Sequence, residues 1–154
     1  MKCNITACGN RIANLITWVE PNLTPTVQLM ARLLMARIFF YSGLTKLDNW
    51  NSTLFLFQYE YSNVPILPPE IAAYMAATAE LTLPILLVLG LGTRFAALGL
   101  FGMTMVIELF VYPGTMEHYY WMVILGLLVA TGGGRIALDR FFAKKFMKDG
   151  ACCA

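Results

Sequence analysis

Seven ionisable side chains lie within or beside strongly apolar segments of the sequence, where charge is rare. They are Arg32, Arg37, Lys46, Glu80, Arg94, Glu108 and His118. A charge at the centre of a bilayer costs at least about 2.5–3.5 kcal/mol, so such groups pair with one another, line a polar interior or reach an interface. These seven residues are therefore the candidates for a site.

Two compatible interpretations of these charges remain open. Buried ion pairs could fix the register of packed helices. The same groups could instead form a polar pocket that holds a ligand headgroup, such as a quinone carbonyl, or that relays protons. The single histidine of the chain supports neither bis-histidine haem nor a histidine-rich metal site, so no metal is predicted.

The elements that carry these residues are expected to be membrane-spanning helices. The chain is 58% hydrophobic and only 13% charged, whereas soluble domains average about 25% charged residues. Four segments are apolar over about 20 residues, the length needed to cross a bilayer: roughly 26–47, 70–91, 94–112 and 119–136. We expect an all-α fold, an integral membrane four-helix bundle in one domain.

The positive charges predict the orientation of this bundle. Lysine and arginine are concentrated before the first segment, in the turn around Arg94 and after the last segment, whereas the 48–69 and 113–118 loops carry acidic residues. Segments rich in lysine and arginine beside a membrane span usually remain on the cytoplasmic side. Both termini are therefore predicted to be cytoplasmic, and the chain is predicted to cross the membrane several times. A formal net charge of +2 gives no reason to expect a nucleic-acid partner.

Short interfacial helices are predicted at both ends. Residues 11–20 have amphipathic spacing, and residues 135–148 mix aromatic and basic side chains, as is typical of helices lying on the bilayer surface. The chain thus divides into an N-terminal segment at 1–25, the bundle at 26–136 and a basic cytoplasmic tail at 137–154. The aromatic 48–69 loop is expected to cover the outer mouth of the bundle.

Depth along the helices predicts which charges meet. At 1.5 Å per residue, Arg37 and Glu80 both lie about 15–16 Å inside the membrane, which makes them predicted partners. Arg32 is near enough to the cytoplasmic edge to extend toward it, and Lys46 is predicted to lie at the outer edge, near Glu108 and His118.

The angular positions of these residues around each helix predict which of them share a face. Arg32 and Lys46 lie on one face of the first segment, whereas Arg37 points about 140° away. The seven-residue spacing of Arg94, Phe101 and Glu108 predicts one inward stripe.

Three stretches carry a family resemblance: "RLLMARIFFYSGLTKL" at 32–47, "AELTLPILLVLGLGTRFAAL" at 79–98 and "GGGRIALDR" at 132–140. Over about residues 28–142 the sequence resembles the DoxX family of small four-span membrane proteins. Members of that family are described as quinone-linked subunits of a thiosulfate-oxidising complex or as membrane partners of oxidative-stress proteins. The resemblance implies a bacterial or archaeal cytoplasmic membrane.

The resulting functional hypothesis is an accessory subunit of a quinone-linked membrane oxidoreductase complex, with quinone as a non-covalent cofactor and a protein partner. The alternative is a non-catalytic scaffold that docks a cytoplasmic redox or stress-defence enzyme through 135–148. Small-solute transport is less favoured, since the sequence shows no inverted repeat of broken helices. Gly99 and Gly102 permit close helix contact, which leaves a homo-oligomer open. All four cysteines lie at the chain ends, so a thiol–disulfide mechanism within the membrane is not expected.

Overall fold

The computed structural model describes residues 5–60 and 68–139, and within these ranges the chain is helical without any strand. Five helices follow one another: α1 (Ile5–Asp48), α2 (Trp50–Tyr59), α3 (Pro69–Leu89), α4 (Thr93–Phe110) and α5 (Met116–Thr131). The predicted all-α fold is confirmed. Of the predicted basic tail at 137–154, only residues 137–139 are described. Cys3, Cys152 and Cys153 also lie outside the described residues.

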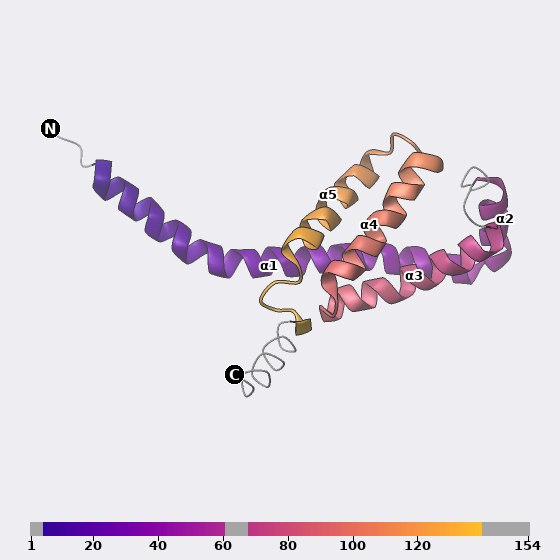
Figure 1. Cartoon of the computed structure of the whole chain (residues 1–154), viewed down its shortest axis with the longest axis horizontal. Helices are drawn as coiled ribbons and strands as arrows, with labels where there is room; N and C mark the ends of the chain where they lie inside the picture. Colours follow the sequence, from indigo (N-terminus) through magenta and orange to yellow (C-terminus); the bar gives the residue numbers. More distant parts are fainter. Residues whose placement is uncertain (1–4, 61–67, 140–154) are drawn as a thin grey trace, which may run out of the picture.

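Helix α1 is much longer than the predicted first span. It has 44 residues and contains Pro21 and Pro25, so residues 11–20 continue into the first span and do not form a separate helix. The part of α1 that is apolar enough to cross a membrane, Leu23–Asp48, begins close to the predicted residue 26. The helix continues through Pro25, although this proline lacks the N–H that would bond the Pro21 carbonyl. Arg135 Nη1 donates to that carbonyl instead, at 3.4 Å. At about 66 Å, α1 exceeds any bilayer core, and its N-terminal part extends away from the other helices (Figure 1).

Four helices pack as two antiparallel pairs. Helix α1 lies along α3, α4 lies along α5, and the pairs meet where α3 contacts α4 and α5 contacts α1 (Figure 1). The core between them is apolar and centred on large side chains that are fully buried or nearly so: Met35, Phe39, Leu87, Leu100, Leu125 and Leu128. This arrangement is the predicted four-helix bundle.

Three stretches of the described chain are long and apolar enough to cross a membrane: Leu23–Asp48, Pro69–Leu89 and Thr93–Phe110. The fourth predicted span corresponds to α5, which has 16 residues and a length of about 24 Å, short of the bilayer core of about 30 Å. It ends at Thr131 rather than residue 136, because Gly132 takes φ +75° and leaves the helical conformation. The cytoplasmic placement of both termini stays a prediction.

Helix α2 occupies Trp50–Tyr59 of the stretch that was expected to be a loop over 48–69. Its N-cap, Asn49, accepts a hydrogen bond from the Ser52 N–H at 3.2 Å, which satisfies a free donor of the first turn. The helix packs on α3 and α1, with the Trp50 and Tyr74 rings 4.6 Å apart. It therefore lies at the end of the bundle where α1 finishes, which we call the α2 end.

The opposite end of the bundle is held by a buried arginine. Arg32 is only 1% exposed, and its guanidinium donates to the carbonyls of Leu87 at 2.7 Å, Val88 at 2.8 Å and Gly133 at 3.0 Å. Two of these carbonyls belong to the last turn of α3, where a cation is favoured. The expectation that Arg32 extends to an interface is wrong, because the neighbouring helix ends supply acceptors inside the protein.

A carboxylate completes this end. Asp139 accepts from the N–H groups of Gly92 at 2.7 Å and Thr93 at 3.0 Å, which open α4, and an anion is favoured at a helix N-terminus. Its own N–H donates to the Gly90 carbonyl at 2.9 Å. The segment after α5 is thereby fastened to the α3–α4 turn, and we call Arg32, Asp139 and this turn the glycine-end latch.

Removing the arginine should destabilise the fold. Arg32→Leu leaves three buried carbonyls without their charged donor, so we expect it to lower the free energy of unfolding by at least about 2 kcal/mol. Arg32→Lys keeps the charge without the planar fork and should restore part of the loss. Thermal unfolding in mild detergent, followed by circular dichroism, measures both; an unchanged midpoint for Arg32→Leu would contradict the latch.

Two glycines provide a matched pair for the turn. Gly90 has φ +72°, and a Cβ there would lie 2.6 Å from Arg32 Nη2 and 2.8 Å from Ala137 Cα, whereas a Cβ on Gly102 meets nothing within 4 Å. Gly90→Ala should therefore cost more than about 1 kcal/mol from its left-handed backbone alone. Gly102→Ala, in the interior of α4, should be neutral or stabilising by up to about 1 kcal/mol. The same unfolding assay tests the contrast, and equal midpoints would refute it.

Candidate functional site

A polar cleft lies at the α2 end of the bundle and has a volume of about 410 Å³. All five helices or their connections contribute to its lining: Ser42, Thr45, Lys46, Asn49, Ser52, Thr53, Leu56, Phe57, Glu80, Ile107, Tyr112, His118 and Trp121. Three of the seven candidate residues, Lys46, Glu80 and His118, are among them. We refer to this feature as the polar cleft.

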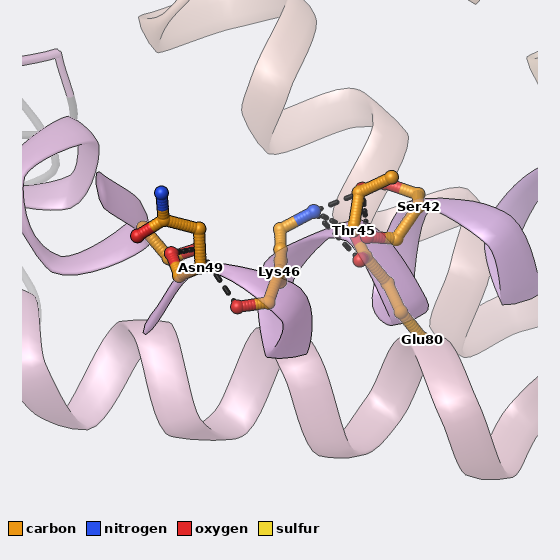
Figure 2. A network of polar contacts seen from close by, with 6 residues as sticks. Ser42, Thr45, Lys46, Asn49 and Glu80 are labelled. Atoms are coloured by element: carbon orange, nitrogen blue, oxygen red, sulfur yellow. Dashed lines mark hydrogen bonds and ion pairs between the residues drawn. The ribbon is translucent and has the colours of Figure 1, made fainter. Parts of the chain in front are cut away.

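An ion pair between α1 and α3 forms one wall of the cleft. The Lys46 ammonium lies 2.6 Å from Glu80 Oε2 and 2.9 Å from Glu80 Oε1, and it donates to Ser42 Oγ at 3.0 Å (Figure 2). The Glu80 side chain is 3% exposed and that of Lys46 is 18% exposed. The pair is thus largely withdrawn from solvent, with the lysine on its more open side.

The predicted pairing of Arg37 with Glu80 is wrong, because depth within each span does not include the offset between the two antiparallel helices. Helix α1 begins at Ile5, and Gly43 lies opposite Glu80, since a Cβ on Gly43 would be 3.2 Å from the Glu80 Cβ. A helical side chain points toward the N-terminus of its own helix, so Lys46 reaches back one turn to the level of Glu80. Because α3 runs antiparallel, the glutamate leans toward the lysine.

Arg37 lies on the opposite side of α1. It is exposed, and its guanidinium carbon is 5.9 Å from the centre of the Tyr41 ring. The prediction from helical angles, that Arg37 points away from the face of Arg32 and Lys46, is confirmed. Arg37 is therefore not part of the polar cleft.

A histidine and a glutamate form the second polar pair. His118 Nδ1 lies 2.7 Å from Glu108 Oε2, and the Gly114 N–H donates to the other carboxylate oxygen at 2.6 Å. The predicted approach of His118 to Glu108 is confirmed, whereas the predicted approach of Lys46 is wrong because that lysine is bonded to Glu80. A carboxylate at Nδ1 favours the tautomer with its proton there, and Nε2 has no hydrogen-bond partner within the described ranges.

The remaining arginines lie elsewhere. Arg32 belongs to the glycine-end latch, and Arg94 is exposed with its Nε beside Gly132. The inward stripe predicted for α4 holds for Phe101 and Glu108, which are partly and fully buried, and fails for Arg94. Within the described residues, no group of three or more histidine, cysteine or acidic side chains could hold a metal ion.

Several hydrogen-bonding residues of the cleft were missed from the sequence. Thr53 Oγ1 donates to the Lys46 carbonyl at 3.0 Å, which ties α2 to the end of α1, and Tyr112 donates its hydroxyl to the Glu60 carboxylate. That hydrogen bond, more than burial or the nearby negative charge, raises the pKa of Tyr112 above its usual value. Hydroxyl side chains are common in the sequence, so only the folded arrangement distinguishes Thr53 and Tyr112.

The ion pair can be tested by a double-mutant cycle. Lys46→Met leaves the Glu80 carboxylate without its cation, and we expect it to lower the free energy of unfolding by about 3 kcal/mol. Adding Glu80→Gln removes the uncompensated charge and should restore much of that loss, giving a non-additive cycle. Unfolding in detergent provides the four values; strict additivity would contradict a direct pair.

Comparisons with known proteins agree with this architecture. The DoxX family matches residues 27–113, a region that runs from α1 through α4 and contains Lys46, Glu80 and Glu108. An uncharacterized protein of Haemophilus influenzae is 30% identical over 135 residues, covering 77% of this chain and 84% of the relative, and no solved structure matches. With three helices able to cross a bilayer and the family match over more than half of its length, the chain is an integral membrane protein of the DoxX family.

Proposed function

We propose that the polar cleft binds the headgroup of a membrane quinone and that the chain serves as an accessory subunit of a quinone-linked membrane oxidoreductase. One observation carries the proposal: Lys46 and His118, each hydrogen-bonded to a carboxylate, line the same cleft. The quinone is a non-covalent ligand, and the partner protein supplies the electron donor.

The chemistry of a quinone headgroup suits these groups. Its ring carries carbonyl oxygens that accept hydrogen bonds, and its reduced form carries hydroxyls that must release protons. His118 Nε2 is able to donate to a carbonyl when protonated and to accept from a hydroxyl when neutral. Glu108 fixes the orientation of the imidazole through Nδ1, as carboxylates do for metal-bound and catalytic histidines.

The apolar part of the cleft suits the ring and its tail. The Trp121 ring lies 5.3 Å from the His118 ring and offers an aromatic surface, and Leu56, Phe57 and Ile107 supply apolar lining. A volume of about 410 Å³ lies in the range of small-molecule sites, about 300–1,000 Å³. Because Lys46 is paired with Glu80, the charges of this wall of the cleft largely cancel, as suits a neutral ligand.

Quinone content tests the proposal. The protein purified in mild detergent should carry quinone that solvent extraction and chromatography detect, and should bind added decylubiquinone. His118→Gln should weaken binding at least about tenfold, because it removes one ionisable hydrogen-bonding group worth about 1.5–3 kcal/mol.

Arg37→Leu is the matched control, since it removes a membrane charge that lies outside the cleft; it should bind quinone as the wild type does. A wild-type protein that neither carries nor binds quinone would overturn the proposal. Equal binding by the wild type and by His118→Gln would exclude His118 as a ligand and would overturn this site.

A further inference from the structure

A second cavity, on another face of the bundle, has Arg37 in its otherwise apolar lining. It is a groove of about 390 Å³ between α1 and α3, and we call it the Arg37 groove. Ala36 and Pro84 are buried beneath it, and large apolar side chains stand around them. Its lining includes Leu33, Ala36, Arg37, Phe40, Pro84 and Ile85.

Arg37 lies in the middle of the apolar stretch of α1. Along the span Leu23–Asp48 it is about 21 Å from the first residue and about 17 Å from the last, further than an arginine side chain extends. Guanidinium groups remain charged in proteins. An exposed charge at this depth costs at least about 2.5–3.5 kcal/mol unless it finds a partner.

This chain does not supply that partner within its described ranges. The contact of Arg37 there is with Tyr41, at 5.9 Å from the ring centre, and a cation–π contact at an exposed site is worth about 0.5–1 kcal/mol. That is less than the cost of the charge. Arg32 differs in this respect, since three carbonyls surround it.

The depth of Arg37 selects among the molecules that could cover it. Lipid phosphates lie at the surface, about 15 Å from the centre of the bilayer core, and do not reach the middle of a span. A second copy of the chain offers no exposed carboxylate at this depth among its described residues, since Glu80 and Glu108 are both buried. A membrane-spanning helix of a different protein is able to carry an aspartate or glutamate to this level.

We infer that the Arg37 groove docks a membrane-spanning helix of a partner protein, with a carboxylate of that helix paired to Arg37. Small residues at the base of a groove let a helix approach closely, and arginine pairs with a carboxylate through two parallel hydrogen bonds. The inference does not depend on quinone binding, because Arg37 lies outside the polar cleft. It assigns the α1–α3 face to the partner and leaves the cleft to the ligand.

Site-specific photocross-linking in native membranes tests the inference. With p-benzoylphenylalanine in place of Phe40, illumination should join the chain to another membrane protein, and the cross-linked peptide should be an apolar span containing Asp or Glu. The same probe in place of Leu98, which is exposed on α4, is the control and should not give this adduct. An adduct with lipid only, with a second copy, or with a segment lacking a carboxylate would overturn the inference.

Two variants make the test specific. Arg37→Leu should reduce the adduct at least tenfold while leaving the thermal midpoint unchanged, and Arg37→Glu should regain it when the partner carboxylate is replaced by arginine. His118→Gln should retain the adduct while binding quinone at least about tenfold more weakly. Failure of the docking inference is therefore distinguishable from failure of the quinone proposal. An undiminished adduct in Arg37→Leu, or no recovery on charge exchange, would show that the charge does not direct docking.

Discussion

The cost of placing charge in an apolar environment organises this structure. Each buried charge has a partner of a different kind: Lys46 has a carboxylate on the adjacent helix, Arg32 has backbone carbonyls at two helix ends, and Glu108 has an imidazole and a backbone N–H. Such groups stabilise only when they are fully paired, because leaving one partner buried alone costs more than the pair contributes. The packing of the four long helices is therefore constrained by a few polar contacts as well as by apolar burial.

These contacts divide the bundle into two unlike ends. At the glycine end, arginine and aspartate are bonded to backbone groups of helix termini, an arrangement with little room for a ligand. At the α2 end, side chains are bonded to other side chains around a cleft, and one nitrogen of His118 is left available. Side chains that hydrogen-bond to backbone groups at helix ends stabilise the fold. Polar side chains that face a cavity are able to exchange their hydrogen-bond partners for a ligand. The proposed site lies at the second end for that reason.

The family match includes Lys46, Glu80 and Glu108 but ends at residue 113, before His118 and Asp139. The wall of the cleft formed by α1, α3 and α4 thus lies within the region shared with the family, and the histidine lies beyond it. Ligand chemistry that depends on His118 is accordingly proposed for this chain rather than for the family. Arg37 lies inside the shared region and on the opposite face of α1, so the two proposals use separate surfaces.

The sequence by itself determined the helical class, the approximate spans and the faces of α1, because apolar length and the helical repeat are local properties. It also placed Glu108 near His118, which are ten residues apart across one short connection. It did not determine the extension of α1 through two prolines, or the pairing of Lys46 with Glu80. Those depend on the offset between antiparallel helices and on side-chain direction, which only the tertiary structure decided, because a shift of two turns moves a charge by about 11 Å and gives it a different partner.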